Sequence, residues 1–222
     1  SIAAKAQTVN KSVRNAAVAE GKVSKANASS YGKPPVEQSI SFNKNHNLGV
    51  KERVLDGYKD GGRKLKFDSN GNPINKPSRE IILVDRKKDS KLQAIINDVK
   101  QQTANMTEKQ KAIFLQHYIY DMSGADRATN QMIRSWADRH TGEEILLGDI
   151  ITANPPVAVC RHRSLLYKIV GDEIGLKVGL QRGNFHSAFG GGGHAWNTVQ
   201  FSDGTSVICD AMHNKSSSIT PG

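Results

Sequence analysis

The order of apolar and polar residues predicts helices in the first two thirds of the chain. Apolar residues recur at helical spacing in three segments, which begin near Asp89, near Thr107 and at residues 126–140. Asp89 or Ser90 can cap the first helix, and the spacing from Thr107 to Gln110 is that of a capping box before the second. The expected inward faces are Leu92, Ile95, Ile96 and Val99; Ile113, Phe114, His117, Tyr118 and Met122; and Ile133, Trp136 and Ala137.

Shorter patterns precede these helices. An amphipathic run that ends at Gly61-Gly62 predicts a short helix stopped by glycine. Residues 68–78 are dense in turn-forming residues and predict a surface loop. The apolar, β-branched run at 80–85 has the length of a buried strand.

The hydrophobic period changes after Cys160. A helix with one strongly apolar face is expected from Cys160 to Gly175, followed by strands at 177–183, 194–201 and 206–212. Asp203-Gly204 between alternating runs predicts a hairpin. This order predicts an α+β fold, in which a helical layer with a central cysteine-bearing helix packs on an antiparallel β-sheet.

Composition limits the number of domains and partners. The 222 residues can form one sizeable core with extensions. Residues 1–38 carry six basic and two acidic residues and are interpreted as a basic arm, helical or partly disordered, and residues 216–222 as a flexible tail. The net charge of +10 favours acidic partners in general, but no nucleic-acid-binding motif accompanies it, so nucleic acid is not expected as a partner.

Cysteine usage and hydropathy point to a compartment. Two cysteines do not form a disulfide framework, which favours a thiol kept reduced and a cytoplasmic protein, or one delivered into a host cytoplasm if it is a bacterial effector. No apolar run approaches the roughly 20 residues that span a bilayer.

Cys160 is the strongest candidate for chemistry. A thiol at a helix N-terminus is exposed to the positive end of the helix dipole, and Arg161 and Arg163 add positive charge, so the thiolate is favoured. Such a nucleophile needs a base and a group that orients the base. The predicted hairpin supplies His194 and, as a diagonal neighbour, Asp210.

Other residues receive weaker roles. Asn197 and Gln131 are candidates for stabilising an oxyanion, and Trp196 is a core aromatic that can also wall a cleft. Cys209 alternates with Asp210 and is expected in the core, and His162 is expected to hydrogen-bond a neighbouring loop. Four glycines at 190–193 suggest a mobile rim.

A metal site is the competing chemical interpretation. The chain lacks a Cys-x-x-Cys pair and a helical His-x-x-x-His, so neither a metal nor another cofactor is expected. The residues of ligand type in this region are His186, His194, Cys209, Asp210 and His213.

Three motifs carry a family resemblance. They are Val159-Cys160-Arg161-His162-Arg163-Ser164-Leu165-Leu166, Asp172-Glu173-Ile174-Gly175-Leu176 and Gly193-His194-Ala195-Trp196-Asn197. Together they resemble the transglutaminase-like branch of papain-fold cysteine enzymes. They are closer still to the peptidase-like domain at the N-terminus of plant Raf-like kinases of the ethylene-response and disease-resistance type, also found in an armadillo-repeat protein.

The resemblance extends over roughly residues 40–212 and implies an enzyme domain at 39–215. It implies Cys160 as nucleophile, His194 as base and Asp210 as the orienting group. No kinase motif is present in the chain. The expected function is thiol-dependent acyl transfer on a protein or peptide substrate, as a protease, a glutamine deamidase or a transglutaminase. The alternative is a catalytically inactive protein-binding module of the same fold.

Overall fold

The computed structural model describes residues 47–62, 64–187 and 190–214. The predicted N-terminal arm (1–38) and C-terminal tail (216–222) both lie outside these residues. The helices are α2 (Ser90–Thr103), α3 (Glu108–Met122), α4 (Asn130–His140), α5 (Leu147–Ile151) and α6 (Cys160–Glu173). The strands are β1 (Lys59–Asp60), β2 (Ile81–Leu83), β3 (Glu144–Leu146), β4 (Lys177–Ser187), β5 (Gly190–Gln200) and β6 (Ser206–Cys209).

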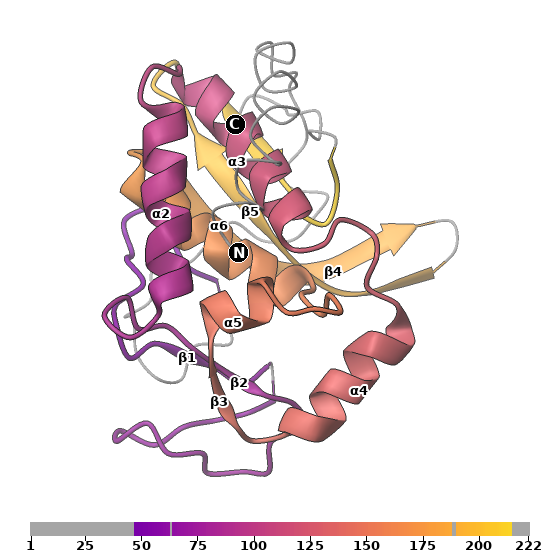
Figure 1. Ribbon diagram of the computed structural model, residues 1–222. Helices are drawn as coiled ribbons and strands as arrows, with labels where there is room; N and C mark the ends of the chain where they lie inside the picture. The colour runs from indigo at the N-terminus through magenta and orange to yellow at the C-terminus, as the bar shows by residue number, and fades with distance from the viewer. Residues whose placement is uncertain (1–46, 63, 188–189, 215–222) are drawn as a thin grey trace.

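The strands form two three-stranded sheets (Figure 1). In the first, β2 pairs antiparallel with β1 and parallel with β3. In the second, β5 lies between β4 and β6, and both pairs are antiparallel. Leu48 adds an isolated antiparallel bridge to Leu180 of β4. Helices combined with these two sheets confirm the predicted α+β class.

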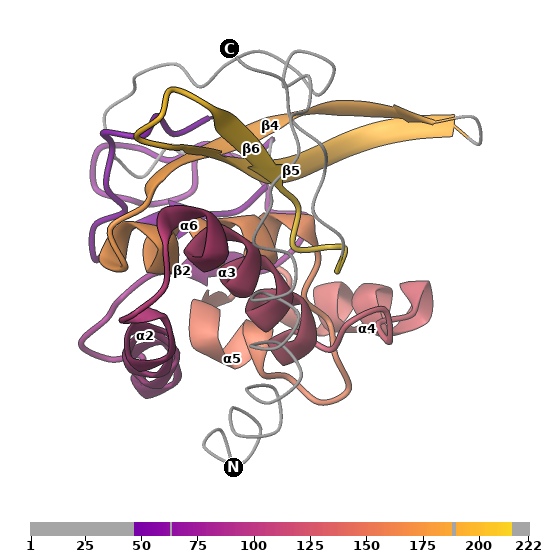
Figure 2. The same cartoon turned by 90° about the horizontal axis from the view of Figure 1, so that it is seen from above.

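Helix α6 lies at the centre of the fold. Figure 2 shows β4, β5 and β6 as one layer above α6 and α3, with α2 and α5 farther from the sheet. Every residue from Arg161 to Gly171 is buried, as expected for a helix covered on several sides. Gly175 follows the helix with φ of 85°, a conformation that glycine adopts without strain.

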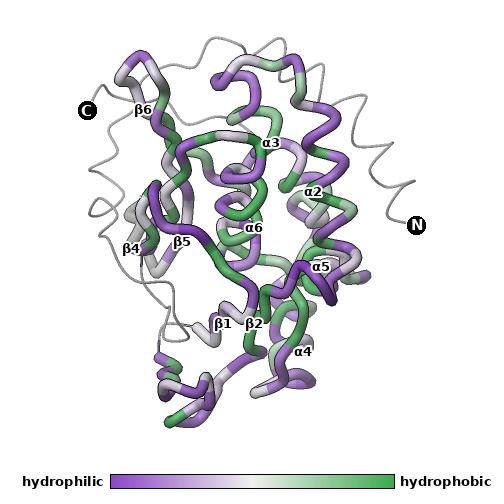
Figure 3. Tube along the Cα trace, turned by 90° about the vertical axis from the view of Figure 1, so that its left-hand side faces the viewer, coloured by the Kyte–Doolittle hydropathy of each residue, from purple (hydrophilic) through white to green (hydrophobic). Residues whose placement is uncertain are grey.

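The predicted core faces hold for two helices and not for a third. The four expected residues of α2 and the five of α3 are buried. Hydrophobic segments of α6 and α3 lie side by side in the interior (Figure 3). Helix α4 begins at Asn130 rather than at residue 126 and contains no fully buried residue. Its Trp136 is only partly buried against the core, because α4 lies at the periphery (Figure 1).

Several local predictions need correction. The expected helix before Gly61-Gly62 is absent, because turns at residues 50–57 lead into β1. Strand β3 and the five-residue α5 were not predicted, since both are too short to show a period. The glycines at 190–193 belong to β5 and pair with β4, so they are strand rather than loop. None of the described helices combines the length and the hydrophobicity needed to cross a bilayer.

The buried carboxylate of Asp89 joins α2 to α5. Its Oδ1 accepts a hydrogen bond from Leu92 N–H at 2.9 Å, and its Oδ2 accepts one from Gly148 N–H at 2.7 Å. A Cβ atom on Gly148 would lie 2.3 Å from Asp89 Oδ1, so the close approach requires glycine. Of the two residues that could cap α2, Asp89 is therefore the cap.

Replacing Asp89 with alanine is expected to lower the free energy of unfolding by about 2 to 3 kcal/mol, because it leaves two buried N–H groups unpaired. Equilibrium unfolding in urea measures this. The matched control is Ser90→Ala, which changes an exposed side chain next to the cap and should cost less than about 0.5 kcal/mol. Equal costs for the two variants would contradict the assignment of the cap.

Candidate active site

Cys160 is the first residue of α6 and is partly exposed. Its thiol is hydrogen-bonded to the imidazole of His194 and to the backbone of Ala195, both on β5. The helix therefore supplies the sulfur atom and the neighbouring strand supplies the groups around it. At the helix start, the N–H groups of the first turn also favour negative charge on this sulfur.

His194 connects Cys160 to Asp210. Its Nε2 lies 2.5 Å from Oδ2 of Asp210, so Nδ1 is the nitrogen left for the thiol. Strand β6 ends at Cys209, opposite Asn197, and Asp210 follows directly, which makes Asp210 a diagonal neighbour of His194. The ring of Trp196 stacks on that of His194 with a centroid distance of 5.9 Å. One ring nitrogen of the imidazole is thus bonded to Asp210, and one ring face packs on Trp196.

Asp210 is itself fixed by contacts that sequence patterns did not reveal. Its Oδ1 accepts the N–H of Met212 at 3.0 Å. Gln116 of α3 donates from Nε2 to the carbonyl oxygen of Asp210 at 3.0 Å. Arg163 of α6 donates to the carbonyl oxygen of Ala211 at 3.1 Å. Two helices therefore hold the segment after β6, and the carboxylate keeps Oδ2 directed at His194.

The pKa values of the two cysteines are shifted in opposite directions. Burial raises the pKa of Cys160, but the hydrogen bond and charge of His194 and the backbone of Ala195 outweigh it and lower the pKa below its ordinary value. Burial lowers the pKa of His194, whereas its bonds to Asp210 and Cys160 raise it to about 10. Both shifts favour the thiolate–imidazolium form of the pair over its neutral form. Burial raises the pKa of Cys209 to about 12, so that core thiol stays protonated.

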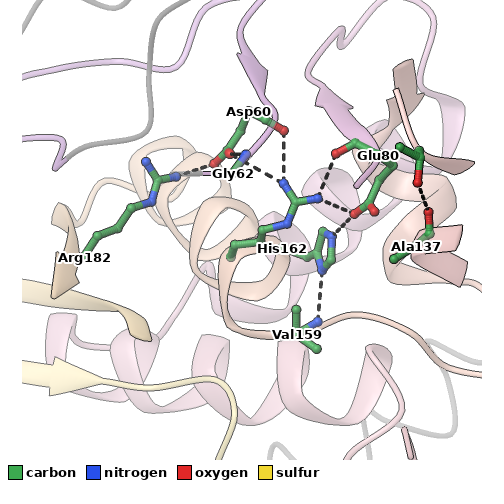
Figure 4. A network of polar contacts seen from close by, with 9 residues as sticks. Asp60, Gly62, Glu80, Ala137, Val159, His162 and Arg182 are labelled. Atoms are coloured by element: carbon green, nitrogen blue, oxygen red, sulfur yellow. Dashed lines mark hydrogen bonds and ion pairs between the residues drawn. The ribbon is translucent and has the colours of Figure 1, made fainter. Parts of the chain in front are cut away.

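A buried network of charges lies beneath the start of α6 (Figure 4). Arg161 donates to Glu80 Oε1 at 2.5 Å and lies 3.5 Å from Asp60 Oδ1. Arg182 of β4 forms a second ion pair with Asp60. His162 accepts the N–H of Val159 at 3.0 Å through Nδ1 and contacts Glu80 Oε1 at 2.6 Å through Nε2. The network ties α6 to β1, β2 and β4.

The network corrects the prediction that Arg161 and Arg163 activate the Cys160 thiol. Arg161 was expected to add free positive charge beside Cys160, but Asp60 and Glu80 balance it. Arg163 is buried and donates to backbone carbonyl groups. The largest influences that lower the Cys160 pKa come instead from β5. His162 contacts the segment before β2, as predicted, and burial lowers its pKa.

A cavity of about 490 Å³ opens beside the thiol. Its walls come from β1 and the segment after it, the residues before β2, the start of α6, and β4 and β5. The lining residues are Asp60, Gly62, Lys64, Ser78, Arg79, Val159, Cys160, Arg161, Arg182, Gly193, His194 and Ala195. The cavity is large enough for several side chains of a peptide, and it reaches both Cys160 and His194.

The remaining site candidates lie elsewhere. The amide nitrogen of Asn197 donates to Ser164 O at 3.0 Å and Gly179 O at 3.3 Å, so both of its N–H bonds are used inside the core. Gln131 is exposed on α4 and is not among the cavity residues. Trp196 is buried and contacts His194 rather than the cavity. In the described part of the chain, no three His, Cys, Asp or Glu side chains gather as metal ligands would.

Comparison with known proteins gives the family of the chain. A family model described as EDR1/CTR1/ARMC3, peptidase-like, matches residues 67–216. The chain belongs to this peptidase-like family. The resemblance read from the cysteine and histidine motifs is thereby confirmed.

A plant kinase shares part of this peptidase-like domain. A probable serine/threonine-protein kinase, SIS8 of Arabidopsis thaliana, is 24% identical over 190 residues. The match covers 74% of this chain and 18% of the kinase, so the chain spans under a fifth of that relative. The family match begins at residue 67 and therefore includes Cys160, His194 and Asp210 but not Asp60 or Lys64.

Proposed function

We propose that this peptidase-like domain is a thiol-dependent acyl-transfer enzyme of papain/transglutaminase type, with Cys160 as nucleophile, His194 as acid and base, and Asp210 as the orienting carboxylate. The observation that carries the proposal is the continuous chain of hydrogen bonds from the Cys160 thiol through His194 to Asp210 at the wall of a cavity. A buried structural cysteine has no need of such a partner, as Cys209 illustrates.

The first half-reaction follows from the resting charges. The Cys160 thiolate attacks the carbon of a carboxamide, and the carbonyl oxygen becomes an oxyanion. The backbone N–H of Cys160, unpaired within the helix because it lies in the first turn, is the proposed donor to that oxyanion. His194 then gives its Nδ1 proton to the departing nitrogen. An amine or ammonia leaves, and a thioester to Cys160 remains.

The second half-reaction needs His194 as a base. Neutral after its proton transfer, the imidazole removes a proton from an incoming water or amine, which attacks the thioester. Collapse returns the thiolate, and the proton remains on His194, so the resting pair is restored. Asp210 holds the imidazole in place throughout. Water as acceptor gives a protease or a deamidase, whereas an amine gives a transglutaminase.

The thiol's dependence on pH tests the proposal. We expect iodoacetamide to alkylate Cys160 at a rate that persists to well below pH ~8.5, where an ordinary thiol loses about tenfold per pH unit. Because the Cys160 pKa is lowered, the thiolate persists as pH falls until that lowered pKa is passed. Mass spectrometry of the labelled protein at limiting dose gives the rate, with glutathione as the reference thiol.

His194→Gln is expected to raise the apparent pKa of Cys160 and to lower alkylation at pH 6 by at least about tenfold, since it removes the imidazolium. The matched control is His140→Gln, which changes a histidine at the end of α4. An ordinary thiol profile for wild-type Cys160, or equal profiles for the two variants, would refute the activated nucleophile and favour a protein-binding module.

A further inference from the structure

The cavity beside Cys160 contains more positive than negative charge. Two of its cations, Arg161 and Arg182, are buried and form ion pairs with Asp60 or Glu80. Those two arginines and two carboxylates balance one another. Lys64 and Arg79 also line the cavity, and both are exposed. Among the residues that the structure describes, neither lies within ion-pair distance of a carboxylate.

Arg79 is held at the cavity by the turn after β1. Gly62 has φ of 93° and donates its N–H to Asp60 Oδ1 at 2.8 Å. A Cβ atom on Gly62 would lie 3.2 Å from Arg79 Cδ, so the arginine chain lies across the bare glycine. The backbone of Arg79 is fixed as well, because its carbonyl oxygen accepts the Gly142 N–H at 3.0 Å. The cation is therefore positioned although it is solvent-accessible.

The positive charge of Arg79 also acts on its neighbours. It lowers the pKa of Arg161, after the larger effect of burial, which places the two cations close together at the same wall. Arg161 is balanced by Asp60 and Glu80, so the positive potential of the cavity comes from Lys64 and Arg79, and it is lowered when an anion binds. The partly enclosed cavity screens such an interaction less than open solvent does.

We propose that Lys64 and Arg79 recognise a carboxylate of the substrate, so that the enzyme acts on carboxamides next to an acidic side chain in a peptide segment. This inference rests on the proposed function, because it assigns a substrate class to the same thiol. Lys64 supplies a mobile point charge, and the guanidinium of Arg79 can hold a carboxylate by two hydrogen bonds. The carboxylates of Asp60 and Glu80 are paired with Arg161 and Arg182, so they repel a substrate carboxylate only weakly.

The test uses short peptidyl chloromethyl ketones that alkylate Cys160, with Glu, Gln or Lys placed in turn at each of three positions. Labelling rates measured by mass spectrometry are divided by the iodoacetamide rate of the same protein. At one position we expect Glu to react at least about fivefold faster than Gln, and Lys more slowly than Gln. Raising the sodium chloride concentration should reduce the preference for Glu.

Lys64→Gln/Arg79→Gln should bring the ratio of Glu to Gln rates close to one. The matched control is Lys66→Gln/Lys76→Gln, which removes two exposed cations from the same segment but outside the cavity and should keep the ratio. Equal Glu and Gln rates in the wild type, or the same change in both double variants, would overturn the acidic-substrate inference. A Cys160 with the alkylation profile of an ordinary thiol would instead overturn the proposed function, and this inference with it.

Discussion

Cys160→Ala is expected to abolish acyl transfer, with a loss of at least about ten-thousand-fold in turnover. The reason is that the proposed covalent thioester cannot form without the sulfur atom. Mass spectrometry of candidate acidic proteins incubated with either enzyme measures the effect. Cleavage, the mass shift of deamidation, or a crosslink also identifies the reaction.

The control for this experiment is Cys209→Ala, which removes the other thiol. Cys209 is fully buried and its pKa is raised to about 12, so its loss should leave turnover unchanged. If wild-type and Cys160→Ala proteins modified the same substrates equally, the cysteine would not be the nucleophile. If no protein were modified by the wild type, a binding module would be the better account.

Glu80→Ala is expected to lower the free energy of unfolding by about 3 to 5 kcal/mol, because it leaves the buried Arg161 cation with a single, longer carboxylate contact, to Asp60 at 3.5 Å. Equilibrium unfolding in urea measures the change. The matched control is Glu144→Ala, which removes an exposed glutamate that pairs with Lys59 in the same sheet and should cost less than about 1 kcal/mol. A cost for Glu80→Ala no larger than that of the control would contradict the role of the network.

The network also predicts a dependence of stability on pH. Burial raises the pKa of Glu80, but its bonds to His162 and Arg161 lower it to about 2. A carboxyl group whose pKa is lower in the folded than in the unfolded chain stabilises the fold above its unfolded pKa of ~4.3. That contribution is lost as the pH falls toward 2. The pH profile of unfolding should therefore be flatter over this range in Glu80→Ala than in the wild type.

The long elements were predictable because each carries its own signal. Helices α2 and α3 have side-chain N-caps, α6 is followed by Gly175, and all three have apolar faces that span three or more turns. The helix predicted before Gly61-Gly62 is wrong because this segment is held by distant backbone bonds, such as Val84 N–H to the carbonyl oxygen of buried Tyr58 at 2.9 Å, rather than by a helix. Apolar spacing over so few residues does not distinguish the two cases.

Some residues of the candidate site were also predictable from the sequence, and others were not. Cys160, His194 and Asp210 could be selected from residue types and hairpin spacing. The residues that hold them could not, because the bonds of Gln116 to Asp210 and of Arg182 to Asp60 join positions 94 and 122 apart in the chain. Asp60 between a short strand and two glycines, and a charged Glu80 at the start of an apolar strand, were the available signals.

The order of the three groups along the chain has a consequence for biosynthesis. Cys160 is translated first, His194 second and Asp210 last, and the backbone around Asp210 is held by Gln116 and Arg163 only when the domain has closed around α6. A nascent chain that ends before Asp210 therefore lacks the carboxylate that contacts His194. Under the proposed mechanism, the catalytic groups would be complete only after the last strand and the turn that follows it have been translated.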